Sequence, residues 1–555
     1  MRWVILLMLL GARLSVAAEF QVKFAPEARS TPADGRLIVV VSKQLEGEPR
    51  FQVNWGLGTQ QIFGMDVNEW RPGQVVHIDG TTVGNPLRNL RDLSSGTYII
   101  QAVLNVYETF HRADGHTVKL HMDQGEGQQW NRSPGNLYSK PQDIQIGPDT
   151  TVPVTLTETI PPIAPPKDTK YVRHVLIESK LLTEFWGRPM HLGAAVLVPE
   201  GFDDHPQQRY PVVFLQGHFG DEFLATLRET PPTGEIKGWE RQAAEAAYQR
   251  YQDWTSGRLP RMLLVITQHA TPYYDDSYGV NTANMGPYGD ALTEELYPYV
   301  EREFRAIGQP WARVVFGGST GGWMTLAEQI FYPDYFGGAW GFCPDPVDFH
   351  AFQMVNVYTD TNAYYDVGAF TRLPKLVGRL PNDHILVTME QFSTQEAVLG
   401  THGRSGGQMD AFHATFGPVD AEGYPAKLWN SETGVIDPEV AKYWREHYDL
   451  TARLERDWER LGPKLVGKLH VTMGTKDTFY LDAAAHRMED FFASTKLPGK
   501  GPYYGGTFEF GDNQPHCYVG KIPEGVPMLS YYLPIFAKHM QTMAPKGADT
   551  ESWSK

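Results

Sequence analysis

The pentapeptide Gly317-Gly318-Ser319-Thr320-Gly321 has the G-x-S-x-G spacing in which a serine hydroxyl can act as a nucleophile. The apolar run Val314–Phe316 before it predicts a short strand, and Gly322–Ala327 after it predicts the start of a helix. A strand-to-helix turn this tight crowds the backbone, so small residues must flank the serine, and the turn lifts its hydroxyl above the sheet. We therefore predict that Ser319 is an activated nucleophile rather than part of a glycine-rich connecting turn.

A second sequence with the same spacing, Gly403-Arg404-Ser405-Gly406-Gly407, lacks this context. The residues before it, 399–402, do not have the pattern of a strand, so nothing would strain the backbone around the serine. We interpret this segment as a flexible loop and expect Ser405 to have no part in the chemistry.

A nucleophilic serine needs a base, and the base needs an acid that orients it. Asp477 follows the predicted strand Leu469–Met473, and His516 follows the predicted strand Thr507–Phe510. Both residues would lie in loops at the carboxyl ends of strands, where open sheets assemble their active sites. The chain order serine, acid, histidine is that of serines on such a turn. We predict Asp477 as the acid and His516 as the base.

Each of these two assignments has a structural alternative. Asp477 could cap a turn or the helix that begins near Leu481, and His516 could be an ordinary loop histidine. Asp482 is the nearest competing acid, but it already belongs to that helix.

The negative oxygen of an acyl-transfer intermediate needs two backbone N–H donors. The amide of Thr320 is one candidate, because the start of a helix leaves its N–H groups unpaired. The predicted strand Val212–Leu215 runs into the Gly-rich turn 216–220, which predicts the second donor. The candidates in that turn are the amides of Gly217, His218 and Phe219.

His218 could bind a metal together with Asp221 and Glu222, but no second histidine lies at ligand spacing.

The elements that must position these residues begin at Tyr171, where strand and helix patterns start to alternate. Apolar residues at helical spacing predict helices over Trp239–Trp254, Tyr288–Arg305 and Met528–Met543. Strands that alternate with helices predict a mostly parallel sheet that helices cover on both faces. The remaining predicted strands are Val172–Ile177, Leu192–Val198, Met262–Thr267 and Ala339–Phe342.

Residues 345–465 interrupt this alternation, and we interpret them as an insertion that caps the active site, within a catalytic domain of residues 169–545. A flexible tail, residues 546–555, would follow. Aromatic residues of the insertion could line a binding cleft, although we expect most of them to form its own core. They are Tyr358, Tyr364, Tyr365, Phe370, Phe412 and Phe416.

The N-terminal part of the chain has a different pattern. Residues 19–157 are rich in strand candidates separated by turns, which predicts a β-sandwich-like domain. Four prolines within residues 161–166 predict a stiff linker over residues 158–168. The strand candidates are Arg36–Ser42, Phe51–Trp55, Val75–Ile78, Thr97–Tyr107 and Val118–Met122.

Residues 1–18 have the pattern of a signal peptide: a positive start, ten apolar residues from Trp3 to Ala12, and small residues at Val16 and Ala18. Ten apolar residues are too few to span a bilayer, which takes about 20. We therefore expect an exported protein, periplasmic or secreted, that has no membrane span.

The composition excludes several classes of protein. Hydrophobic residues make up 41% and charged residues 21%, which is ordinary for a globular chain and excludes low-complexity disorder. The net charge of −16 becomes 47 − 65 = −18 after loss of Arg2 and Arg13, and this acidity argues against a nucleic-acid partner. Two cysteines in 555 residues exclude a disulfide scaffold.

The stretches Tyr210–Gly220, Asn284–Arg305 and Arg313–Cys343, with the loops of Asp477 and His516, resemble the esterase D-type family of α/β-hydrolases. That family includes S-formylglutathione hydrolases, feruloyl esterases, enterochelin esterases and mycolyltransferases. The resemblance covers most of residues 171–545 outside the insertion. It implies an α/β-hydrolase fold and Ser-Asp-His hydrolase chemistry without a metal or an organic cofactor. The N-terminal domain resembles those of enterochelin-esterase-like proteins in position and class only.

Together these features predict an exported serine hydrolase that cleaves a small or polymer-linked carboxylic ester through an acyl-enzyme. A serine peptidase or an acyltransferase would use the same triad, so both alternatives stay open. A catalytically dead protein that binds glycan or peptide is the alternative from another class, and intact candidates at all three positions argue against it.

Cys343 and Cys517 would both lie near the carboxyl edge of the sheet, and export would permit a bridge. One strand lies between them, which predicts about 9–10 Å, too far for a bridge unless the loops converge. We expect two free thiols.

Overall fold

The computed structural model describes residues 18–553, apart from residues 45, 148, 220–225, 235–236 and 496–505. The predicted signal peptide lies outside the described residues except for Ala18, as do Asp221 and Glu222. Within the described part of the chain, no helix is long and apolar enough to cross a bilayer. The chain forms two compact units: unit 1 holds the residues up to Val106 and Gly135–Ile160, and unit 2 holds Tyr107–Pro134 and the residues from Pro161 onward.

Unit 1 is built of strands, and its described helical turns are η1 (Pro49–Phe51) and η2 (Leu90–Asp92). The predicted strand Phe51–Trp55 is wrong, since a turn stands there. One sheet has the order β10-β1-β4 and a second has the order β11-β8-β6-β2-β3-β5. The strands are β1 (Glu19–Phe24), β2 (Ala33–Ser42), β3 (Gln61–Trp70), β4 (Val76–Ile78), β5 (Gly84–Asn85), β6 (Gly96–His111), β8 (Leu137–Tyr138), β9 (Gln142–Ile146), β10 (Thr151–Leu156) and β11 (Glu158–Thr159).

The segment Tyr107–Pro134 belongs to unit 2, although it falls within the predicted first domain, residues 19–157. Strand β6 continues into unit 2, where its end pairs with β7 (Thr117–Leu120). Beyond β7, the Gln128 side chain donates a hydrogen bond to the carbonyl of Thr271 at 2.8 Å. A long strand thus carries a loop of the N-terminal half of the chain into unit 2.

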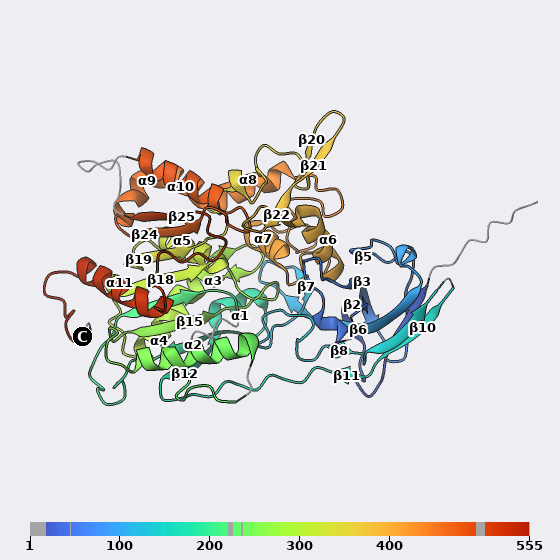
Figure 1. Ribbon diagram of the computed structural model, residues 1–555, viewed down its shortest axis with the longest axis horizontal. Coiled ribbons are helices and arrows are strands. Elements are labelled where there is room, and N and C mark those ends of the chain that lie inside the picture. The colour runs from blue at the N-terminus through green and yellow to red at the C-terminus, as the bar shows by residue number, and fades with distance from the viewer. Residues whose placement is uncertain are drawn as a thin grey trace, which may run out of the picture. The chain divides into compact units, whose positions relative to one another are not determined.

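Unit 2 contains an eight-stranded sheet with the order β12-β13-β15-β14-β18-β19-β24-β25 (Figure 1). Strand β13 runs antiparallel to both of its neighbours, and the pairs from β15 to β25 are parallel. All eight predicted strands are present, with ends shifted by at most two residues. They are β12 (Val172–Ser179), β13 (Met190–Leu197), β14 (Val212–Gln216), β15 (Leu263–Gln268), β18 (Arg313–Gly318), β19 (Gly338–Phe342), β24 (Leu469–Gly474) and β25 (Thr507–Gly511).

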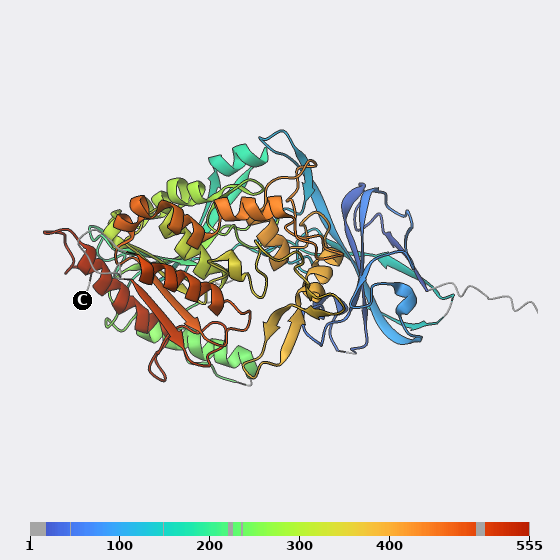
Figure 2. The same cartoon turned by 90° about the horizontal axis from the view of Figure 1, so that it is seen from above.

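Helices cover both faces of this sheet. Side chains of successive residues in a strand point to opposite faces of the sheet. Two neighbouring residues of β19 therefore face different helices. Trp340 packs on Phe536 of helix α11 with ring centroids 4.8 Å apart, whereas a Cβ on Gly341 would meet Leu326 of helix α5. In Figure 2, α2 (green) lies on the same side as α11 (dark red). The helices are α1 (Lys180–Trp186), α2 (Gly238–Trp254), α3 (Tyr288–Asp290) continuing through η4 (Ala291–Leu296) into α4 (Tyr297–Glu303), α5 (Thr320–Phe331), α9 (Leu450–Leu465), α10 (Asp482–Ser494) and α11 (Met528–Met543).

The insertion between β19 and β24 is shorter than the predicted residues 345–465, because α9 packs against α5 and α10 as the helix that returns to β24. Of its six predicted core aromatics, Tyr364, Phe412 and Phe416 are buried, Tyr358 and Tyr365 are half-buried, and Phe370 is fully exposed. Phe416 packs on Trp323 of α5 with ring centroids 5.1 Å apart, so the insertion shares its core with the sheet. It contains η6 (Phe349–Ala351), β20 (Tyr365–Val367), β21 (Arg372–Pro374), β22 (Leu376–Arg379), β23 (Ile385–Thr388), α6 (Met389–Leu399), α7 (Gln408–Phe416) and α8 (Pro438–His447).

The C-terminal residues, predicted as a flexible tail, pack on unit 2. The side chain of Trp553 is fully buried, and its carbonyl accepts a hydrogen bond from the amide of Arg261 at 2.7 Å. Its indole N–H donates to the carbonyl of Asp549 at 3.0 Å, so the last turn is closed on itself.

Because this tryptophan is buried, Trp553→Ala should lower the free energy of unfolding by about 3–5 kcal/mol, the usual effect of truncating a large core aromatic. Urea denaturation of the full chain measures it. Trp239→Ala is the matched control, since Trp239 is 75% exposed and its loss should change stability by less than about 0.5 kcal/mol. Equal effects of the two substitutions would contradict the packing of the tail.

Candidate active site

Ser319 occupies a strained turn between β18 and α5. Its backbone has φ 56° and ψ −123°, a combination that non-glycine residues rarely adopt. Its amide donates a hydrogen bond to the carbonyl of Phe342, at the end of β19, at 3.0 Å. The predicted strand before the serine and helix after it are both present, so the residue sits on the sharp turn that the pentapeptide predicts.

Glycines around the serine allow this turn to fit between neighbouring strands. A Cβ on Gly321 would lie 2.1 Å from the carbonyl oxygen of Gln216 and 3.0 Å from the Cα of Gly217. A Cβ on Gly322 would lie 2.5 Å from the carbonyl oxygen of Phe342. Any larger residue would push the start of α5 away from β14 or β19, so the small residues are required by close backbone contact.

The three residues predicted as nucleophile, base and acid form one chain of hydrogen bonds. His516 Nε2 lies 2.9 Å from Ser319 Oγ, and His516 Nδ1 lies 2.7 Å from Asp477 Oδ2. Asp477 is fully buried, and its Oδ1 accepts hydrogen bonds from the amides of Phe479 at 2.8 Å and Leu481 at 3.3 Å. One carboxylate oxygen is therefore fixed by backbone while the other faces the imidazole.

The environment of His516 favours its charged form. Burial opposes that form, but the hydrogen bonds and charges of Asp477 and of the Cys517 thiolate outweigh burial and raise the pKa of His516 to about 10. Phe479 packs edge-on against the imidazole with ring centroids 4.9 Å apart, which holds the plane of the ring.

The loop that carries His516 crosses the end of β24. The amide of Lys476 donates to the carbonyl of Gln514 at 3.0 Å, and the amide of Thr475 donates to the carbonyl of Gly511 at 2.9 Å. A Cβ on Gly474 would lie 2.2 Å from the carbonyl oxygen of Gln514. Only a glycine at the end of β24 lets the acid loop and the histidine loop lie this close.

The turn predicted to supply the second oxyanion donor lies directly beside the serine. Gly217, His218 and Phe219 follow β14, whose last residue, Gln216, is fully buried. The side-chain amide of Gln216 donates a hydrogen bond from Nε2 to Glu328 of α5 at 2.8 Å, and burial raises the pKa of the Glu328 carboxyl to about 8. This buried contact fixes the end of β14 against α5, the helix whose first residue is Thr320.

Comparisons with known proteins bear on the same region. Residues 186–498, more than half of the chain, match the family model described as "Putative esterase". The chain belongs to this family. The fold predicted for unit 2, an α/β-hydrolase, and the hydrolytic nature of the enzyme agree with this membership. No curated protein sequence matches the chain.

Several solved structures are similar to this esterase. A ferulic acid esterase aligns over 67% of this chain and 97% of its own, with 13% identity and a TM-score of 0.36. An S-formylglutathione hydrolase from Agrobacterium tumefaciens covers 68% and 98%, with 14% identity and a TM-score of 0.34. A fluorophosphonate-binding serine hydrolase from Staphylococcus aureus covers 67% and 98%, with 13% identity and a TM-score of 0.33.

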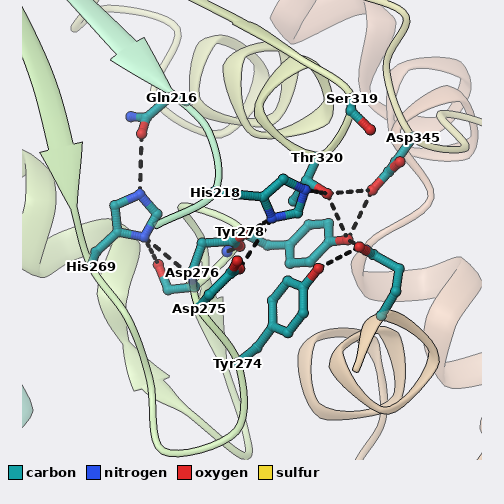
Figure 3. A network of polar contacts seen from close by, with 12 residues as sticks. Gln216, His218, His269, Tyr274, Asp275, Asp276, Tyr278, Ser319, Thr320 and Asp345 are labelled. Atoms are coloured by element: carbon teal, nitrogen blue, oxygen red, sulfur yellow. Dashed lines mark hydrogen bonds and ion pairs between the residues drawn. The ribbon is translucent and has the colours of Figure 1, made fainter. Parts of the chain in front are cut away.

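A second polar network, which the sequence patterns did not predict, lies next to Ser319 (Figure 3). His218 Nδ1 lies 3.1 Å from Asp275 Oδ1 and 3.5 Å from Asp276 Oδ2. Burial opposes the charged imidazole, but these two carboxylates raise the pKa of His218 well above its usual value. The two carboxylates therefore favour the charged form of the His218 side chain, whereas the oxyanion prediction concerned its backbone amide alone.

The same network reaches Thr320, the residue after Ser319. Thr320 Oγ1 lies 3.4 Å from His218 Nε2 and donates to Asp345 Oδ2 at 3.1 Å (Figure 3). The Tyr278 hydroxyl donates to the same oxygen at 2.8 Å, and Gln408 of α7 donates to that hydroxyl. Asp275 and Asp276 follow β15 and Asp345 follows β19, so their position after strand ends was the available signal.

The loop around Gly127, from the N-terminal half of the chain, packs against the turn Gly217–Phe219. A Cβ on Gly127 would lie 2.9 Å from the Cβ of Phe219 and 3.2 Å from the Cβ of Asp275. This loop therefore restricts where both residues can lie. Nothing in its sequence signals that position, because Gly127 is 219 − 127 = 92 positions from Phe219 and 275 − 127 = 148 positions from Asp275.

Ser405, the second serine with G-x-S-x-G spacing, has a carboxylate and a backbone amide as neighbours in place of an imidazole. It is buried, its hydroxyl accepts from the amide of Gly407 at 3.0 Å, and it lies 3.4 Å from Glu396. Hydrogen bonds thus hold this segment as a turn before α7, so the predicted flexible loop is wrong.

Three groups of described side chains have the composition and spacing to hold a metal ion. They are His218 with Asp275 and Asp276, Cys343 with His516 and Cys517, and Asp348 with His350 and Asp449. The first two groups use side chains that the hydrogen bonds above already engage. The alternative metal site of His218 with Asp221 and Glu222 involves two residues outside the described part of the chain.

Because Gly474 lets the histidine loop approach Asp477, Gly474→Ala should displace that loop and lower kcat/KM by about 100-fold, the usual effect of misplacing a catalytic group by about 1 Å. The loss should fall mainly on kcat, and ester hydrolysis kinetics would measure it. Gly58→Ala is the control, since a Cβ there meets nothing within 4 Å. Full activity of Gly474→Ala would show that the loop tolerates the displacement.

Proposed function

We propose that this esterase is an exported serine carboxylesterase in which Ser319, His516 and Asp477 are the catalytic triad. The observation that carries the proposal is the unbroken chain of hydrogen bonds from Asp477 through His516 to Ser319, at 2.7 and 2.9 Å. A strained serine at the start of a helix, in contact with an oriented imidazole, is the arrangement that acyl transfer requires.

The proposed reaction has two halves. Ser319 Oγ attacks the acyl carbonyl while His516 Nε2 accepts its proton, and Asp477 stabilises the resulting imidazolium at Nδ1. The amide of Thr320 and an amide of the turn Gly217–Phe219 hold the negative oxygen. The alcohol leaves with the proton from His516, and water activated by the same imidazole then hydrolyses the acyl-enzyme.

The environment of His516 leads us to expect that kcat/KM falls at low pH. His516 must be neutral to accept the serine proton, and its neighbours raise its pKa. We expect kcat/KM to fall as the pH falls through that pKa, because protonated imidazole cannot act as a base. The same environment stabilises the imidazolium that forms during the attack.

Export and the role of unit 1 are further parts of the proposal. The apolar segment Trp3–Ala12 and the small residues Val16 and Ala18 support removal of a signal peptide, so that an external ester is the substrate. The strands of unit 1 surround their own apolar core, in which Phe24 and Trp70 pack with ring centroids 4.9 Å apart. We assign unit 1 as a β-sandwich-like accessory domain.

Ser319→Ala should lower kcat by about 10⁶-fold while the chain stays folded, because the nucleophile and its base act together. Hydrolysis of an activated aryl ester measures the loss, and labelling by a fluorophosphonate should disappear with it. Ser405→Ala is the matched control and should keep both activity and labelling. The opposite result, in which Ser405→Ala loses activity, would overturn the assignment of the nucleophile.

A panel of matched esters and amides separates the proposal from its alternatives. We expect esters to be cleaved with a much higher kcat/KM than amides of the same acyl group, since an alkoxide leaves more easily than an amide nitrogen. Preferred cleavage of amides would indicate a serine peptidase. Transfer of the acyl group to an added alcohol in preference to water would indicate an acyltransferase.

A further inference from the structure

The two cysteines of the chain lie together at the proposed base. They are 517 − 343 = 174 residues apart, and the structure holds both as free thiols, as predicted. The sulfurs of Cys343 and Cys517 and a ring nitrogen of His516 all lie within 4.8 Å of one another. Cys517 follows His516 directly in the chain, and Cys343 follows the strand that holds the amide of Ser319.

The prediction that the intervening strand keeps the cysteines apart is wrong, because the histidine loop does not stay in line with its strand. Cys343 follows β19 directly, and its amide donates to the carbonyl of Thr472 in β24 at 2.7 Å. The loop after β25 passes over the end of β24 through the contact between Lys476 and Gln514. This path brings Cys517 across the strand that separates β19 from β25.

The two thiols have different environments. Cys517 is exposed, and the neighbouring Cys343 thiol and the His516 imidazole lower the pKa of its thiol to about 5. Cys343 is buried, and its hydrogen bond to Cys517, together with burial, raises its pKa well above the usual value. An exposed thiolate beside a buried thiol is the arrangement of an attacking and a resolving cysteine.

The backbone holds both residues in unusual conformations. Cys343 has φ 38° and Cys517 has φ 64°, in the left-handed region that few non-glycine residues occupy. Such conformations persist where the surroundings fix them. The positions of the two sulfurs are thus set by the ends of β19 and β24 and by the histidine loop.

We propose that Cys343 and Cys517 form a thiol–disulfide exchange site, which a low-molecular-weight disulfide oxidises to an intramolecular cross-link beside His516. The cross-link would tie the histidine loop to the strand end that also binds the amide of Ser319. The proposal rests on the proposed function only where it concerns His516 as the base.

The disulfide reagent is the oxidant in this exchange, and it accepts the two electrons that the two cysteines lose. The Cys517 thiolate attacks one sulfur of the reagent, which forms a mixed disulfide and releases one thiolate. The Cys343 sulfur then attacks the Cys517 sulfur, its proton passes to the second thiolate as that leaves, and the protein disulfide forms. Two protein thiols are oxidised, and one reagent disulfide is reduced to two thiols.

The cross-link changes the charges around His516. The charged or titratable groups that face its imidazole are Asp477, Cys517, Cys343 and, at longer range, Asp345. Oxidation removes the Cys517 thiolate from this set and leaves Asp477 as the main group that favours the imidazolium. The pKa of His516 should then fall, so that the base is neutral at lower pH.

The experiment treats the fully reduced full-length protein with glutathione disulfide, then counts thiols after denaturation and measures the intact mass. The wild-type chain should lose both thiols and the mass of two hydrogen atoms. Cys343→Ser should stop at one added glutathione on Cys517, and Cys517→Ser should keep its single buried thiol. Two remaining thiols in the wild type, or a wild type that stops at the mixed disulfide, would overturn the proposal.

The pH dependence of kcat/KM gives a second readout that a merely structural pair would not move. In both the oxidised protein and Cys517→Ser, the acid limb of the profile should move to lower pH. A limb that lies one pH unit lower gives a kcat/KM about tenfold higher at any pH on that limb. An unmoved limb in both would refute the coupling to His516. Thiol counts and masses do not depend on ester hydrolysis, so a failure of the proposed function is distinguishable from a failure of this inference.

Discussion

The strained backbone of Ser319 is the constraint on which the rest of the site depends. A non-glycine residue with φ 56° costs about 1–3 kcal/mol, and it persists only if its surroundings fix it more strongly than that. Two strands and one helix supply this support. The amide of Ser319 is held by Phe342 of β19, and α5 is pressed against Gln216 of β14 through Gly321. The proposed nucleophile is thus placed by the parallel sheet, not by its own loop.

The same sheet explains why the base and the acid arrive at the serine from distant parts of the chain. Parallel strands end at one edge, so the loops after β18, β24 and β25 meet there although Ser319 and His516 are 197 residues apart. Close backbone contact then sets how near these loops lie to one another. The absence of a side chain at Gly474 lets the acid loop and the histidine loop approach each other, as its absence at Gly321 lets β14 approach α5.

Sequence patterns predicted those parts of the site that depend on local rules. Alternating strand and helix patterns located the eight strands, and turn chemistry located Ser319, Asp477 and His516. The network of His218, Asp275, Asp276 and Asp345 joins three separate segments, and the position of the aspartates after strand ends was its one signal in the sequence. The loop around Gly127 and the burial of Trp553 also depend on contacts between residues far apart in sequence. The convergence of the two cysteines depends on the path of one loop across a strand, which no local pattern encodes.

Two buried aspartates lie near Ser319, and their hydrogen bonds indicate which of them orients the proposed base, His516. The amide of Asp345 donates to the carbonyl of Ser319 at 3.2 Å, so this residue is the nearer of the two along the backbone. Its Oδ2, however, already accepts from the hydroxyls of Tyr278 and Thr320, and burial raises its pKa. Asp477 has one oxygen bound by backbone amides and the other directed at the imidazole. Asp345 Oδ2 is thus bound to Tyr278 and Thr320, whereas Asp477 is the aspartate whose oxygen lies 2.7 Å from His516 Nδ1. The insertion contributes to this choice, because Gln408 of α7 fixes the Tyr278 hydroxyl.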